Sequence, residues 1–242
     1  MKKSIIYSLL FTIQLITGAY AQNKKVAVVT FYVNKLIDVA NTGPASMTAA
    51  FAQLGDDLKF NIGPLLTNFH DQFFENYAKS FPFQLLPENQ VTGNDAYKDF
   101  APENGGFKDI LKGNTYVPVN GYKVILPLKG NANEKKLLNI FDQCDGIMKV
   151  YINFDLESRG LGRVALVKVN AQVNIVLFNR NGDKIFSVKK EALSKKSGAQ
   201  VAGIPFITPE KILPLCESAM DELMIAMQND LPKMAGKADR KL

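Results

Sequence analysis

The sequence contains a single histidine, His70, which is the residue type best suited to acid–base catalysis near neutral pH. It lies beside the apolar positions of a predicted helix that starts at Pro64. A histidine base also needs a nucleophile and a group that orients its ring, which only proximity in three dimensions could supply. The pattern therefore favours a residue on the flank of a helix over a catalytic base.

Sequence motifs of the common hydrolases, zinc enzymes and nucleotide-binding proteins are missing. The chain has no Gly-x-Ser-x-Gly, no His-Glu-x-x-His, no phosphate-binding loop and no closely spaced cysteine pair. We therefore predict a protein that is not an enzyme, with no catalytic residues, no metal and no cofactor.

Two carboxylates lie two residues apart, Asp155 and Glu157, on a predicted strand whose same face carries Asn153. Such a group could bind a hard cation or act as an acid–base pair. A calcium site usually draws six or more oxygens from a shaped loop, and no such loop follows. A solvated polar face is the favoured interpretation.

The sulfur-containing side chains leave two alternatives open. Cys144 ends one predicted helix and Cys216 lies on the apolar stripe of another, so both fit buried thiols, while a disulfide is worth considering if the chain is exported. Met220, Met224 and Met227 could line a groove for a small apolar ligand, because methionine is common on adaptable binding surfaces, or they could pack in the core.

The first half of the chain predicts a β-α-β start. Val26–Val33 is a continuous β-branched and aromatic run, typical of a strand buried on both faces. A helix follows from Pro64, with Leu65, Phe69, Phe73 and Tyr77 on one side, and Phe83–Leu86 predicts a short parallel strand. The turn-rich segment 87–130 reads as a long loop insertion, which is either a binding surface or an ordinary surface loop.

The second half predicts an antiparallel meander with one polar face. After a helix capped by Asn133, apolar residues alternate with polar ones in two long strands, and Asn181-Gly182 is a strong hairpin signal before a third strand. A final helix opens at Thr208-Pro209 and covers the apolar face. The polar face is predicted to bind a partner through Lys149, Tyr151, Asn153, Lys168, Asn170 and Gln172.

The N-terminus has the three regions of a secretory signal peptide, namely Lys2-Lys3, an apolar run from Ile5 to Ile16, and small residues ending at Ala21. We expect cleavage after Ala21, which gives a leader of residues 1–21 and an exported protein, periplasmic or secreted, that starts at Gln22. The expected cleavage point has no cysteine to which a lipid anchor could be attached. We expect no transmembrane segment, since no later run reaches roughly 18 apolar residues.

The composition fits one folded domain. The chain has 242 residues, 47% of them hydrophobic and 21% charged, and a net charge of +6 that shrinks when the leader is removed. Disorder, collagen and disulfide scaffolds are excluded by this balance. Nucleic-acid binding is not expected, because the basic residues form no stripe with interleaved aromatic residues.

The order of these elements resembles a small envelope α/β domain. Cys144-Asp145-Gly146 leads into a central strand, and the hairpin turn reads Asn179-Arg180-Asn181-Gly182-Asp183. This is similar to curli-secretion-channel proteins (CsgG-like), penicillin-binding-protein activator lipoproteins (LpoB-like) and the N-terminal domain of TolB. The resemblance implies a domain that binds other envelope proteins or assembles with itself, without catalysis. The resemblance assigns a functional role to no individual residue of this chain.

We therefore predict a single α/β domain over residues 22–242, with α+β character, built on a mixed sheet with helices mainly on one face. The predicted function is that of an exported, non-enzymatic envelope protein that binds other proteins or assembles with itself. The alternative is a carrier of a small apolar ligand held between the C-terminal helix and the sheet.

Overall fold

The computed structural model describes residues 24–38, 54–103, 115–159, 164–201, 204–205, 208–235, 238 and 242. The predicted leader lies outside these residues, as does part of the predicted insertion, 104–114. None of the helices within these ranges is long and apolar enough to cross a membrane.

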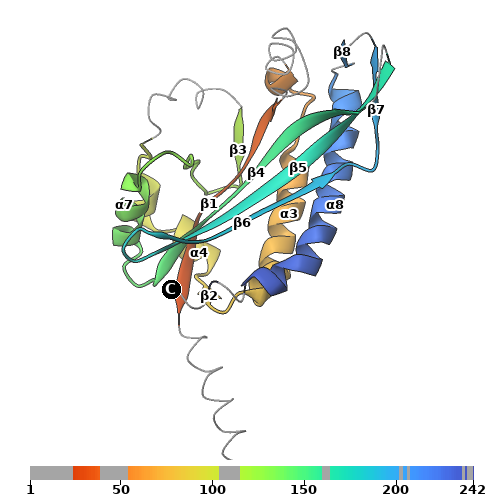
Figure 1. Cartoon of the computed structure of the whole chain (residues 1–242). Coiled ribbons are helices and arrows are strands. Elements are labelled where there is room, and N and C mark those ends of the chain that lie inside the picture. The colour runs from red at the N-terminus through yellow and green to blue at the C-terminus, as the bar shows by residue number, and fades with distance from the viewer. Residues whose placement is uncertain are drawn as a thin grey trace, which may run out of the picture.

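One mixed sheet organises the molecule, which confirms the predicted α/β class (Figure 1). Its long strands are β1 (Lys25–Asp38), β4 (Gly146–Arg159), β5 (Val164–Asn179) and β6 (Lys184–Leu193). Its short strands are β2 (Gln84–Leu85), β3 (Tyr116–Pro118), β7 (Gly198–Val201) and β8 (Ile204–Pro205). β1 pairs in parallel with β2 and with β4, whereas β4, β5 and β6 form the predicted antiparallel meander.

Two helices cover one face of the sheet, α3 (Gly63–Glu75) and α8 (Pro209–Ala235), and they lie side by side in Figure 1. A proline in the first turn of α3 starts that helix, as predicted for Pro64. The 3-10 helix η1 (Tyr77–Ser80) follows α3 and leads the chain back to β2, which runs parallel to β1. The β-α-β start is therefore present.

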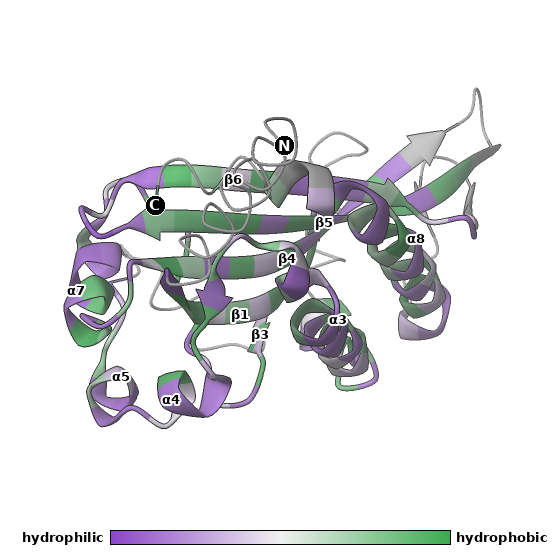
Figure 2. Cartoon of the chain, turned by 90° about the horizontal axis from the view of Figure 1, so that it is seen from below, coloured by the Kyte–Doolittle hydropathy of each residue, from purple (hydrophilic) through white to green (hydrophobic). Residues whose placement is uncertain are grey.

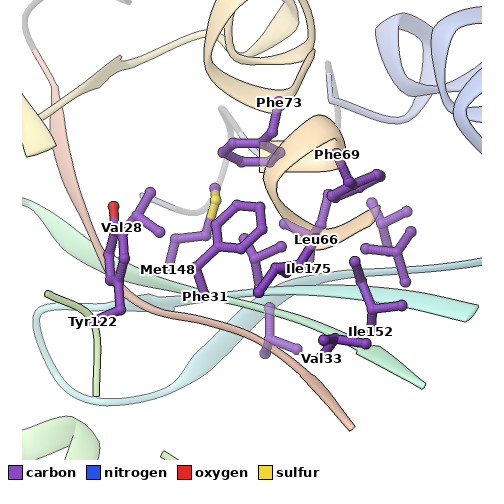
Figure 3. Close-up of a cluster of buried hydrophobic side chains, with 14 of the residues drawn as sticks. Val28, Phe31, Val33, Leu66, Phe69, Phe73, Tyr122, Met148, Ile152 and Ile175 are labelled. Atoms are coloured by element: carbon purple, nitrogen blue, oxygen red, sulfur yellow. The ribbon is translucent and has the colours of Figure 1, made fainter. Parts of the chain in front are cut away.

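The main hydrophobic core lies between α3 and the strands (Figure 3). Leu66, Phe69 and Phe73 point from α3 towards the sheet, where side chains of β1, β4 and β5 meet them. Those strand residues are Phe31, Val33, Met148, Ile152 and Ile175, each at most 2% exposed. Burial of this many aromatic and branched side chains is the main stabilising contribution to the fold.

The described part of the predicted insertion, residues 87–103 and 115–130, is more ordered than a loop. It contains the short helices α4 (Glu88–Thr92) and α5 (Asp95–Asp99) as well as β3, which pairs with β1. The fully buried Tyr97 holds it to the sheet, because its hydroxyl donates to the carbonyl of Val29 (2.8 Å) and accepts from the amide of Lys123 (2.9 Å). The insertion is therefore part of the folded domain.

A third helix with more than two turns, α7 (Ala132–Ile140), lies on the side of the sheet opposite α3 and α8 (Figure 1). It packs at the start of β4, where β5 ends and β6 begins. Figure 2 shows that β4 and β5 are mostly hydrophobic at this end. The sheet face that the sequence predicts to be polar is therefore covered by α7 at the start of β4, and it is polar at the other end.

Candidate functional site

The candidate site is the face of the sheet opposite α3 and α8, and it has two parts. The first part, called the polar sheet face below, is formed by side chains of three neighbouring strands. The strand register aligns Tyr151 with Asn174, Asn153 with Gln172 and Glu157 with Lys168. β6 extends the row, with Lys189 beside Asn174 and Glu191 beside Gln172. The polar sheet face comprises Tyr151, Asn153, Asp155, Glu157, Lys168, Asn170, Gln172, Asn174, Lys189 and Glu191.

Four of the six residues predicted to bind a partner are accessible on this face. Tyr151, Asn153, Lys168 and Gln172 are each half-buried. The expectation of an open polar surface is corrected at the other two, because Asn170 is only 6% and Lys149 only 2% exposed. Alternation in a strand shows which side chains share a face, but it does not reveal what covers that face.

Lys149 is covered by α7 and by the chain segment that precedes it. Its ammonium group donates to Glu134 Oε1 of α7 at 2.8 Å and to the carbonyl of Leu126 at 3.3 Å. Both partners of this ion pair are buried, with side chains 2% and 7% exposed. A buried charge is tolerated only when it is paired and hydrogen-bonded, and here both conditions are met.

The second part of the site is a pocket of about 290 Å³ beside this ion pair, called the Lys149 pocket below. Lys149 and Glu134 contribute charged groups to its lining, and Tyr151 connects it to the polar sheet face. The remaining lining residues are Pro127, Leu128, Gly130, Val176, Phe178 and Lys184. A smaller pocket of about 180 Å³ adjoins it and shares Leu128, Gly130 and Glu134.

A cluster of tyrosines borders the polar sheet face on the β1 side. Tyr32 and Tyr151 are neighbours in the strand register, and their rings stack at 5.6 Å between centroids with an angle of 11°. Tyr116 of β3 packs edge-on against Tyr32 at 5.6 Å. Burial raises the pKa of Tyr151, so its phenol stays neutral and can act as a hydrogen-bond donor at physiological pH.

Charges of both signs lie on the polar sheet face. Burial raises the pKa of Asp155, and the nearby carboxylates of Asp38, Glu191 and Glu157 raise it further, against the opposing effect of Lys189. The amide of Gln172 donates to Asp155, and the ammonium of Lys168 donates to the carbonyl of Ser194 at 2.9 Å. No group of three or more histidine, cysteine, aspartate or glutamate side chains that could hold a metal ion occurs in the part of the chain that the structure describes.

His70 is engaged through both ring nitrogens. Nε2 lies 2.7 Å from Oε1 of Glu88, and Nδ1 lies 3.1 Å from Oδ1 of Asp71. The Tyr122 hydroxyl donates to the same Glu88 oxygen at 2.9 Å. These contacts connect α3 to α4, at the position on the flank of the helix that the sequence favours.

Both cysteines and two of the three methionines proposed to line a ligand groove lie in the core. Cys144 and Cys216 are both free and fully buried. Met220 and Met227 are buried at 2% and 1% exposure, and Met224 is half-buried beside them. The two pockets described above are lined by other residues, so the structure does not bring the three methionines together around either of them.

Sequence reasoning missed most of the Lys149 pocket. Glu134 precedes Lys149 by fifteen residues on a different element, and no motif connects the two. Phe178 and Val176 interrupt the polar alternation at the end of β5, and they are the one local signal that this end of the face is covered.

Comparison with known proteins gives little further information. No family model matches the sequence, and no curated protein matches it. Among solved structures, the fold is weakly similar to a neuraminyllactose-binding hemagglutinin homolog from Helicobacter pylori. The TM-score is 0.38 at 9% sequence identity, over 90% of this chain and 88% of that chain. A similarity of this size carries no information about function.

Proposed function

We propose that this chain is an exported, non-enzymatic cell-envelope protein that binds other proteins through its polar sheet face. The observation that carries the proposal is the unequal covering of the two sheet faces by the helices that the structure describes. α3 and α8 pack on the opposite face, whereas α7 packs against the start of β4. The stretch from Tyr151 to Glu157, with its neighbours on β5 and β6, keeps half-buried and exposed polar groups on a rigid support.

The chemistry of this face suits recognition of a protein surface. Lys168 and Lys189 lie among the carboxylates of Asp155, Glu157 and Glu191, so the face presents charges of both signs. Such a pattern selects a partner with complementary charges and rejects others. The half-buried Tyr151 adds an aromatic residue of the type enriched at protein interfaces.

A non-enzymatic role is supported by the contacts of the His70 ring. The ring nitrogens of His70 both have carboxylate partners, and its ring packs against Phe31 and Phe74 at 5.0 and 4.9 Å between centroids. A histidine held in this way supports the contact between α3 and α4. Export is supported by the signal-peptide pattern at the N-terminus, and it predicts that the exported protein begins at Gln22.

Charge reversal on the polar sheet face tests the proposal. Lys189→Glu changes a residue whose side chain is 57% exposed, so the fold should tolerate it. The matched control is Lys59→Glu, at a residue 77% exposed beside Glu210 of α8. We expect Lys189→Glu to reduce by at least tenfold the amount of partner that copurifies from the exported fraction, and Lys59→Glu to leave it unchanged.

A third variant tests the insertion as the binding surface. Lys98 of α5 is 55% exposed and pairs with Asp95. If Lys98→Glu removed the partner while Lys189→Glu retained it, the insertion rather than the polar sheet face would be the interface. If all three variants retained the partner equally, the proposal would be wrong.

A further inference from the structure

The Lys149 pocket has the properties of a binding site for a small anion with an apolar body. Its volume of about 290 Å³ is just below the range of about 300 to 1,000 Å³ that is usual for ligand pockets. Pro127, Leu128, Val176 and Phe178 form apolar walls. A ligand that fits must therefore be small and must present an apolar group to these walls.

The charges around the pocket favour an anionic ligand. In its interior, the negative charge of Glu134 is compensated by Lys149, because the two form an ion pair at 2.8 Å. Lys184 at the mouth has no ion-pair partner among the described residues, and neither has Lys129 in the adjoining pocket. Glu103, the other acidic residue lining the adjoining pocket, pairs with Lys136. The net charge of the side chains around the mouth of the pocket is therefore positive.

Two further features can help to hold an anion. The Lys149 ammonium has three N–H donors, and among the described residues two of them have hydrogen-bond partners, Glu134 and the carbonyl of Leu126. The same ammonium lies over the Phe178 ring, 5.8 Å from its centre. α7 begins beside the pocket at Ala132, and no side chain caps its N-terminus. The N-terminus of a helix carries partial positive charge that attracts anions.

From these observations we infer that the Lys149 pocket binds a monocarboxylate with an apolar body. The carboxylate lies between Lys184 and Lys149, and the apolar body lies against Leu128, Val176 and Phe178. One lysine at the mouth matches a single negative charge. The carboxylate belongs either to a free small acid or to the C-terminus of a peptide that ends in an apolar residue. This inference is independent of the proposed protein-binding role of the polar sheet face.

Titration calorimetry of the purified protein with 3-phenylpropanoate tests the inference. Two reference compounds separate its components, since acetate lacks the apolar body and 3-phenylpropanol lacks the charge. We expect saturable binding of one 3-phenylpropanoate per chain, at least tenfold tighter than either reference. No binding of 3-phenylpropanoate, or equal binding of a reference compound, would overturn the inference.

Variants of the pocket residues test whether 3-phenylpropanoate binds in the Lys149 pocket. Lys184→Glu at the mouth is expected to weaken binding at least tenfold, and Leu128→Trp is expected to abolish it by filling the pocket. The control is Lys59→Glu, which makes the same charge change at a residue 77% exposed that lines neither pocket, and it should alter affinity less than twofold. Loss of binding to the same degree in Lys184→Glu and Lys59→Glu would mean unspecific attraction and would overturn the inference.

Short peptides distinguish the two sources of the carboxylate. An acetylated Gly-Gly-Phe peptide with a free C-terminus is compared with its C-terminal amide. Tighter binding of the free peptide than of 3-phenylpropanoate assigns the pocket to a chain terminus. Binding of 3-phenylpropanoate alone assigns it to a free acid.

Discussion

The Lys149 ammonium lies 2.8 Å from Glu134 Oε1, and this ion pair joins β4 to α7 where the two side chains are only 2% and 7% exposed. Removing one charge leaves the other buried without a partner, which costs about 3 to 5 kcal/mol in folding stability. We therefore predict that Lys149→Met lowers the free energy of unfolding, measured by urea denaturation, by about that amount.

The double variant Lys149→Met with Glu134→Leu provides the control. It replaces both charges with apolar groups, so most of the lost stability should return. If Lys149→Met alone cost less than about 1 kcal/mol, the ion pair would not be buried as described.

The contact between His70 and Glu88 makes stability depend on pH. Burial lowers the pKa of His70, but the hydrogen bonds to Glu88 and Asp71 outweigh burial and raise it above the ordinary value of 6.5. Burial raises the pKa of Glu88, but the hydrogen bonds from His70 and Tyr122 outweigh burial and lower it below 4.5. The charged pair is therefore favoured in the folded state.

The signs of the two shifts define a pH window. The contribution of His70 is fully present below pH 6.5 and is lost as the pH rises through its raised pKa. The contribution of Glu88 is present above pH 4.5 and is lost as the pH falls through its lowered pKa. We predict that the stability difference between the natural protein and His70→Gln is largest between pH 4.5 and 6.5 and shrinks towards pH 9, as measured by urea denaturation at each pH. A difference that grew with pH would contradict this assignment.

The two thiols are predicted to be unreactive in the folded protein. Burial raises the pKa of Cys144 to about 11, and nearby Asp145 adds to the effect. Burial also raises the pKa of Cys216. Because the thiolate is the reactive form, iodoacetamide at pH 8 should label neither cysteine in the native state and both in denaturant without reductant. Mass spectrometry gives the number of labelled cysteines per chain. A chain that stayed unlabelled in denaturant would hold a disulfide instead.

Gly146 begins β4 at a point where a side chain has no room. A Cβ atom there would lie 2.4 Å from the carbonyl oxygen of Phe178 on the neighbouring strand, and a backbone atom cannot move aside cheaply. Gly146→Ala should therefore destabilise the fold by about 1 to 3 kcal/mol.

Gly55→Ala is the matched control, since its Cβ would make an ordinary contact of 3.5 Å with Leu36. Its midpoint of thermal unfolding should stay close to that of the natural protein. Equal midpoints for the two variants would mean that the strands approach less closely at Gly146 than described.

The sequence predicts the strands well because their patterns are local. The continuous β-branched and aromatic run of Val26–Val33 corresponds to the continuously buried part of β1, and the alternation after Met148 corresponds to β4. Asn181-Gly182 forms the predicted turn, with Gly182 at φ 79°, a conformation that glycine adopts without strain.

The site could be predicted only in part, because its essential contacts are not local. The alternation places Lys149 and Tyr151 on the same face, yet Lys149 is buried by α7 and the chain before it, which no pattern in the strand reveals. The contact of His70 with Glu88 likewise joins α3 to the insertion, whose turn-rich composition gives no sign of α4.

Photo-crosslinking from the polar sheet face tests the proposed function most directly. A benzophenone side chain replaces Asn153, and a control protein carries it at Asp221, an exposed position on α8. Both proteins are irradiated in the cells that produce them. The proposal predicts a crosslink from position 153 to a defined protein species and none to that species from position 221. Equal crosslinking from the two positions, or none from position 153, would contradict it.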